Sequence, residues 1–133
     1  MSPAEVKRAP QRIQEIVKAV LQRNAMRGVQ LAQPSHYNRA EEMADGRPPA
    51  ATVRRFMLDY WTDVEIATPD ADCRYFSEHL YEMKPLIGIR QRIYVKFGLE
   101  IDPDNNAASH IRILRFHPAI DSDPIERIPE ARR

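Results

Sequence analysis

The chain has 133 residues, enough for one domain, and 43% of them are apolar, which suffices for a hydrophobic core and excludes wholesale disorder. Its 20 basic and 19 acidic residues give a net charge of +1, so a uniformly basic, polyanion-binding surface is excluded. The single cysteine, Cys73, excludes a scaffold held together by internal disulfides.

Four segments carry the apolar spacing of amphipathic helices. The clearest are residues 11–26, with apolar side chains at i, i+3, i+4, i+7 and i+8 from Ile13, and residues 50–64, with a wide apolar face. A short helix is predicted over 36–44 and another over 70–83, which Pro85 would end.

Residues 86–101 fit two periods. Apolar residues at every second position from 93 to 101 indicate a strand, whereas Leu86, Ile89, Ile93 and Phe97 also fit a helix, and we favour a helix through Phe97. Residues 110–116 are rich in isoleucine and predict a strand, which we expect to pair with 93–101 in a hairpin.

The expected fold is therefore mainly α: a helical domain of about four helices with a short C-terminal β-hairpin or strand. It would occupy residues 1–118. Residues 119–133 alternate proline and charge, and we expect them to form an extended or disordered tail.

The near-zero net charge conceals a separation of charge along the chain. Residues 1–55 hold 10 basic and 5 acidic groups, or +5, and residues 56–82 hold 1 and 7, or −6. Residues 83–99 hold 4 basic groups and no acidic ones, or +4, and the remainder holds 5 and 7, or −2. Such blocks indicate either neutralisation within the fold or across a homodimer, or a basic face for nucleic-acid phosphates.

Residues 37–57 resemble the helix-turn-helix unit of many bacterial DNA-binding regulators. The matching residues are the small or apolar Ala40, Met43 and Ala44 on a first helix, Gly46 in the turn, and 52–55 on a second helix. The resemblance implies that the second helix lies in the major groove of double-stranded DNA. Carried over by position, the contacts would be Arg47, Thr52, Arg54 and Arg55.

A second set of basic residues, Arg90, Arg92 and Lys96, would add phosphate contacts. The predicted function is thus a small, non-enzymatic regulatory protein that binds DNA. The alternative is a protein-interaction module, an adaptor or small subunit, that uses the acidic region 59–82. Its contact residues would include Leu58 and Tyr81, which fall off the apolar stripes of their helices.

The residue spacing does not indicate metal binding, phosphate binding by a glycine-rich loop, or catalysis. The four histidines and Cys73 do not match the spacing of zinc ligand pairs, and no phosphate-binding glycine loop or nucleophile motif occurs. We expect no metal, no cofactor and no catalytic activity. With polar first residues and no window near the ~20 apolar residues that span a bilayer, we expect no secretory signal, no membrane partner and a cytoplasmic location.

Overall fold

The computed structural model describes residues 11–23, 29–32, 38–66, 80–87, 91–102, 107–120 and 127–129. The helices there are α2 (Gln11–Arg23), α3 (Ala40–Ala44) and α4 (Pro49–Asp59), followed by a 3-10 turn, η1 (Trp61–Asp63). The strands are β1 (Val29–Leu31), β2 (Glu65–Ile66), β3 (Leu80–Met83), β4 (Leu86–Ile87), β5 (Gln91–Asp102) and β6 (Ala107–Pro118).

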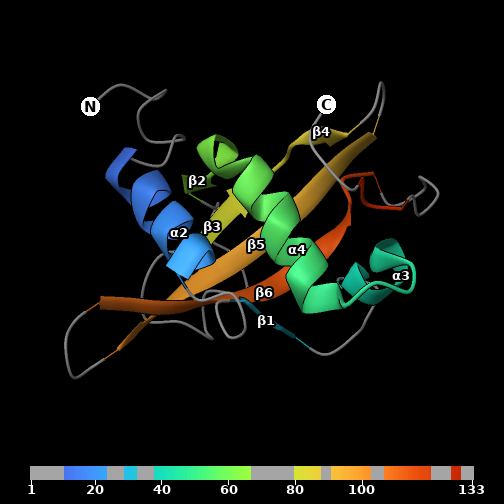
Figure 1. Ribbon diagram of the computed structural model, residues 1–133. Coiled ribbons are helices and arrows are strands. Elements are labelled where there is room, and N and C mark those ends of the chain that lie inside the picture. The colour runs from blue at the N-terminus through green and yellow to red at the C-terminus, as the bar shows by residue number, and fades with distance from the viewer. Residues whose placement is uncertain are drawn as a thin grey trace.

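The strands form one mixed sheet, and helices cover one of its faces. The order is β1-β6-β5-β3-β2, with β4 also paired to β5. The β1–β6 pair is parallel and the other strand pairs are antiparallel. Figure 1 shows α2 and α4 lying across the same face of the sheet. We call this the core face, and the opposite one the outer face.

The expected mainly helical fold is wrong, because the chain is an α/β protein with a six-stranded mixed sheet. The helix favoured through Phe97 is instead β4 and β5. In β5 the buried side chains Ile93, Val95, Phe97 and Leu99 occupy alternate positions, which is the period of a strand. The predicted hairpin is confirmed, and its two strands are longer than expected.

The end of the helix predicted over 70–83 is also a strand. Residues 80–83 form β3, in which Tyr81 and Met83 lie opposite Phe97 and Val95 of β5 and join the same core. The earlier part of that prediction lies outside the described residues. Tertiary pairing with β5 has overridden a local helical spacing here.

The two strongest helix predictions are confirmed in α2 and α4. In α2 the residues Val17, Val20 and Leu21 are fully buried, and in α4 Val53, Phe56 and Met57 are. The ring of Phe56 meets that of Phe116 edge to face at 5.7 Å between centroids, an arrangement favoured by aromatic quadrupoles. This contact ties α4 to β6.

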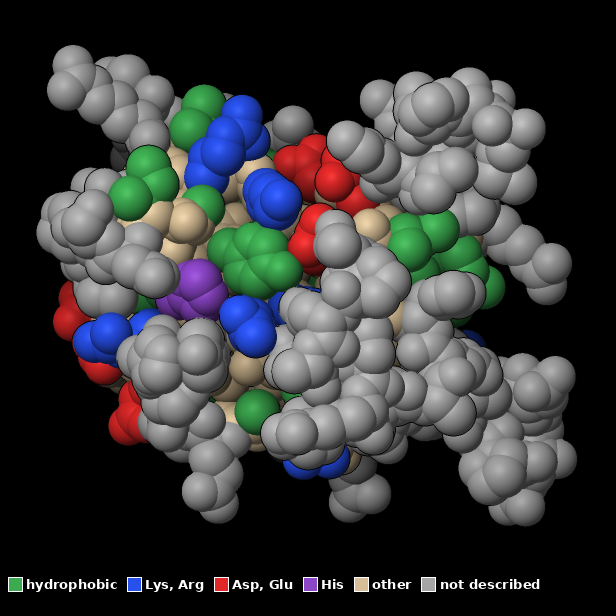
Figure 2. All heavy atoms as spheres, turned by 180° about the vertical axis from the view of Figure 1, so that it is seen from behind, with side chains coloured by type: hydrophobic (Ala, Val, Ile, Leu, Met, Phe, Trp, Pro, Cys, Tyr) green, Lys and Arg blue, Asp and Glu red, His purple; other side chains and the backbone are tan. Residues whose placement is uncertain are grey.

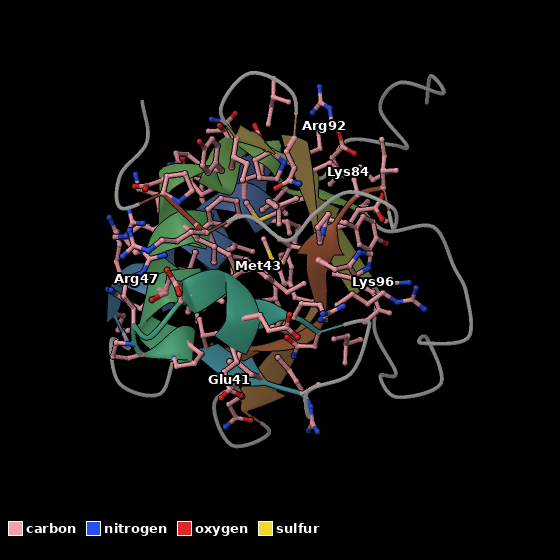
Figure 3. The ribbon with its side chains drawn as sticks, turned by 90° about the vertical axis from the view of Figure 1, so that its right-hand side faces the viewer. Glu41, Met43, Arg47, Lys84, Arg92 and Lys96 are labelled. Atoms are coloured by element: carbon pink, nitrogen blue, oxygen red, sulfur yellow. The ribbon has the colours of Figure 1, made fainter. Side chains whose placement is uncertain are left out.

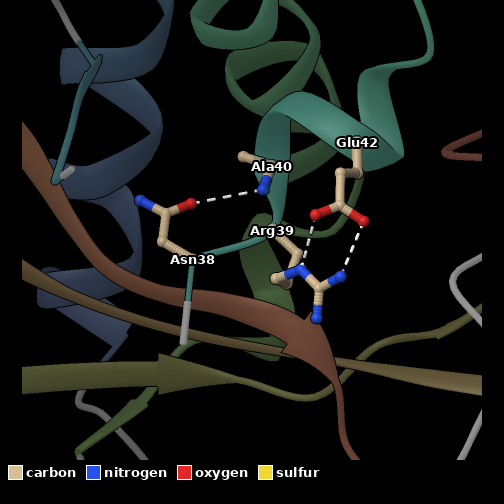
Figure 4. A network of polar contacts seen from close by, with 4 residues as sticks. All are labelled: Asn38, Arg39, Ala40 and Glu42. Atoms are coloured by element: carbon tan, nitrogen blue, oxygen red, sulfur yellow. Dashed lines mark hydrogen bonds and ion pairs between the residues drawn. The ribbon is translucent and has the colours of Figure 1, made fainter. Parts of the chain in front are cut away.

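Asn38 joins the N-terminal part of the fold to β6. Its backbone bridges Phe116 in the parallel direction, continuing the line of β1 along the same strand. Its side-chain Nδ2 donates to the carbonyl of Ala32 at 2.9 Å. Its Oδ1 accepts from the backbone N–H of Ala40 at 3.2 Å (Figure 4). One buried amide thus connects the end of β1 to the first turn of α3.

Arg39 and Glu42 form a two-pronged ion pair on the surface of α3. Arg39 Nε and Nη2 donate to the two carboxylate oxygens of Glu42 at 2.8 and 2.7 Å. The hydrogen bonding from Arg39, together with the attraction between the two charges, lowers the pKa of Glu42. The same hydrogen bonding raises the pKa of Arg39.

Replacing Asn38 with alanine should lower the free energy of unfolding by about 1–3 kcal/mol, because it leaves a buried N–H and a carbonyl without their partner. Urea unfolding followed by circular dichroism measures the change. Glu41→Ala, an exposed change on the same helix, is the control and should have little effect. Equal stability of the Asn38 variant and the wild type would contradict the connecting role.

Arg39→Gln should raise the pKa of Glu42 towards its ordinary value, as read from the carboxyl carbon in an NMR titration. Arg39→Lys should restore only part of the shift, because the hydrogen bond is its largest cause. Since the pKa is lowered in the folded state, the pair's contribution is present above the ordinary pKa of Glu42 and is lost as the pH falls through the lowered value. An unchanged titration of Glu42 in Arg39→Gln would show that the pair does not form in solution.

Candidate nucleic-acid interface

The segment that resembles a helix-turn-helix contains two helices joined by a tight turn. Asp45 and Gly46, with φ of 52° and 83°, end α3 in left-handed conformations, and α4 begins at Pro49. Glycine adopts this conformation without steric cost. Ala40, Met43 and Ala44 are buried, as expected of a helix that packs closely.

Two of the predicted DNA contacts are turned inwards. Thr52 is only 6% exposed, and its hydroxyl donates to the carbonyl of Pro48 at 2.8 Å, so it does not reach a base from this position. Arg47 Nε donates to the carbonyl of Ala44 at 2.7 Å, and its Nη2 donates to that of Ile128 at 2.5 Å.

The arginines of α4 also bind the chain's own carbonyls. Arg54 Nε donates to the carbonyl of Leu21 at 2.6 Å, in the last turn of α2, where the helix dipole favours a cation. Arg55 pairs with Asp59 at 3.0 Å and donates from Nη2 to the carbonyl of Pro129. These guanidinium groups hold elements of this chain together, and DNA binding through α4 stays a prediction.

Residues 127–129, here called the C-terminal strap, cross the α3–α4 unit. The side chain of Ile128 is fully buried in the core, and its N–H donates to the carbonyl of Met43 at 2.8 Å. Arg127 lies 3.3 Å from the carboxylate of Asp45 in the turn. The strap therefore occupies the surface on which Arg47 and Arg55 lie.

The outer face of the sheet presents the other basic residues. Side chains alternate between the faces of a strand. The outer face of β5 therefore carries Arg92, Tyr94 and Lys96, and that of β6 carries Arg112, Arg115 and His117. Figure 2 shows Lys and Arg side chains on this face around a hydrophobic patch, next to a histidine. In Figure 3, Lys84, Arg92 and Lys96 lie on the sheet side and Arg47 on the helix side.

Tyr94 is at the centre of a row of polar contacts. Its hydroxyl donates to Glu82 Oε2 at 2.9 Å, and its ring lies 5.5 Å, between centroids, from that of His117 on β6. Lys84 Nζ stands 5.7 Å from the centroid of Tyr94 and 3.7 Å from Glu82 Oε1. The carboxylate of Glu82 thus holds both the phenol and the ammonium group.

The residues predicted to contact phosphates lie in different environments in the structure. Arg92 is exposed, and its Nη1 donates to the carbonyl of Lys84 at 2.7 Å. Lys96 is only 1% exposed, and in the sheet register it lies between Glu82 of β3 and Arg115 of β6. Arg90 lies outside the described residues.

Sequence reasoning missed Arg112 and Arg115. Arg112 is exposed and Arg115 half-buried, and in register they lie opposite Gly98 and Lys96. The signal was present: a strand predicted over 110–116 with isoleucines at 111 and 113 places Arg112 on the opposite face. A bulge between Ile113 and Arg115 then keeps Arg115 on that face as well.

The predicted protein-contact residues belong to the core side. Leu58 is half-buried and packs against the core cluster. Tyr81 is 9% exposed, and its ring lies 5.9 Å, between centroids, from that of Phe97. Much of the acidic region, residues 67–79, lies outside the described residues, so the interaction-module alternative stays a prediction.

Within the described part of the chain, no group of three or more His, Cys, Asp or Glu side chains could hold a metal ion. The helices described here are too short or too polar to cross a bilayer. The chain matches no protein-family model, no curated protein and no solved structure.

Ile128→Ala should lower the free energy of unfolding by about 2–5 kcal/mol, because it removes a fully buried aliphatic side chain and leaves a cavity. Ile120→Ala is a matched control: the same atoms are removed from a side chain that is 60% exposed, and the change should stay within about 0.5 kcal/mol. Chemical unfolding of the two variants measures both values. Equal effects would show that the C-terminal strap is not docked in solution.

Proposed function

We propose that the protein binds single-stranded nucleic acid across the outer face of its sheet. The observation that carries this proposal is the Tyr94–His117 ring pair, flanked by the basic side chains of three adjoining segments. Lys84 follows β3, Arg92 lies on β5, and Arg112 and Arg115 lie on β6.

Unpaired bases suit such a surface. A base can stack on an aromatic ring only when it is splayed out of a duplex, and stacking tolerates any sequence because every base has a π-face. Lys84 is 50% exposed, so its flexible side chain can turn from the Tyr94 ring to a phosphate as a base stacks.

Charge on this face favours a phosphate backbone. Among its described residues, five basic side chains (Lys84, Arg92, Lys96, Arg112, Arg115) accompany the carboxylates of Glu65 and Glu82. Glu82 is buried and already bonded to Tyr94. The exposed cations therefore dominate the potential that an approaching strand meets.

A helix in the major groove of a duplex is the competing hypothesis. It requires Arg54 and Arg55 to give up their contacts with Leu21, Asp59 and Pro129. Because the bonds to Leu21 and Pro129 join separate elements, their loss would weaken the fold at the moment of binding. On the outer face, Arg92 and Arg112 are exposed, so a phosphate can approach their guanidinium groups from solvent.

Fluorescence anisotropy with a labelled single strand and the matching duplex tests the proposal. We expect tighter binding of the single strand and, for four phosphate contacts, an affinity loss of roughly 50-fold between about 50 and 200 mM salt. Arg92→Gln with Arg112→Gln should weaken binding and reduce the salt slope by about 1.4.

Tyr94→Leu should lower affinity by about 1–3 kcal/mol, the value of one base stacked on an aromatic ring. Tyr94→Phe is its matched control: it keeps the ring, loses only the bond to Glu82, and should retain affinity. Arg54→Ala with Arg55→Ala should leave affinity intact once circular dichroism shows a folded protein. If the protein instead binds the duplex more tightly than the single strand, and the double change abolishes that binding, the interface lies on α4 and the outer-face proposal is overturned.

A further inference from the structure

A cleft of ≈ 630 Å³ opens where α2 approaches the ends of the sheet strands. It is lined by Gln14 of α2, by residues 62–65 at the junction of η1 and β2, and by Lys84 and Arg92. All of these side chains except Val64 are polar. The volume lies in the range of sites for small molecules. We call it the η1 cleft.

The walls of the η1 cleft carry opposite charges. Its lining includes the acidic Asp63 and Glu65, here called the acidic wall, and the basic Lys84 and Arg92, here called the basic wall. Among the described residues, no ion pair joins the two walls: Lys84 pairs with Glu82, and Arg92 donates to the carbonyl of Lys84. Asp63 and Glu65 are thus not paired with Lys84 or Arg92.

The backbone around the cleft is fixed before any ligand arrives. Gln14 Nε2 donates to the carbonyls of Thr62 and Val64 at 3.0 and 3.1 Å, so α2 holds the acidic wall. Val64 is fully buried, and its N–H donates to the carbonyl of Trp61 at 3.3 Å. On the basic wall, Arg92 Nη1 donates to the backbone carbonyl of Lys84. A preformed site loses little conformational entropy on binding.

We infer that the η1 cleft binds a small zwitterion of the amino-acid class. The carboxylate of such a ligand would face Lys84 and Arg92, and its ammonium group would face Asp63 and Glu65. A ligand with one charge satisfies one wall and leaves the other unpaired, so the cleft discriminates by requiring both charges. This site extends beyond nucleic-acid binding, but it uses two of the same cations, so the two ligands would compete.

The test is a titration of the ¹⁵N-labelled full chain, without nucleic acid, using 4-aminobutyrate as the zwitterion. Butylamine and butyrate are the controls, since each carries one of its two charges on the same carbon chain. We expect shifts in the amides of residues 62–65 and in the side-chain amide of Gln14. The affinity for 4-aminobutyrate should exceed that for either control by about tenfold.

Asp63→Asn with Glu65→Gln should remove this preference, and Glu41→Gln, an exposed change outside the cleft, should not. Because the double variant keeps Lys84 and Arg92, it should still bind the oligonucleotide, so the two proposals can fail separately. Equal binding of butyrate and 4-aminobutyrate would show a simple anion site and overturn the zwitterion. Absence of shifts up to about 10 mM ligand would overturn the site itself.

Discussion

The antiparallel pairing of β5 with β6 is the constraint on which the rest of the molecule depends. Each strand has 12 residues, and β5 also pairs with β3 and β4 while β6 pairs with β1. Strand alternation divides both sequences into two sets of side chains. The apolar set, including Phe97 and Phe116, receives α2 and α4, and the polar set, including Tyr94 and Arg112, forms the outer face. One hairpin therefore specifies both the core and the proposed interface.

The arginines on the two sides of the sheet have different tasks. On the helix side, Arg47, Arg54 and Arg55 donate to backbone carbonyls of other elements and so connect α2, α4 and the C-terminal strap. On the sheet side, Arg92 and Arg112 are exposed, and Arg92 donates to the nearby carbonyl of Lys84. A planar group with five donors serves either purpose equally well.

Long-range contacts explain which features could be predicted from sequence. Helices α2 and α4 could be predicted, because their apolar spacing fits only the helical period. The sequence of β5 fits both the helical and the strand period, and pairing with the neighbouring strands decides between them. A lysine is rarely buried, so nothing local indicates that Lys96 lies between Glu82 and Arg115. The partners of Arg54 and Arg47 lie 33 and 81 residues away, beyond any motif. Arg112, by contrast, follows from alternation within a single strand.

The docking of Ile128 against Met43 has a consequence for how the chain acquires its structure. Two neighbouring contacts, β1 on β6 and the C-terminal strap on α3, both join residues about 80 positions apart. Closing such loops lowers the conformational entropy of the chain before the contacts that stabilise the fold have formed. A topology of this kind folds slowly and leaves the apolar faces of α2 and α4 open until β6 is in place. During synthesis, the apolar faces of α2 and α4 therefore stay uncovered until β6 has been made, and exposed apolar surface of this kind favours aggregation.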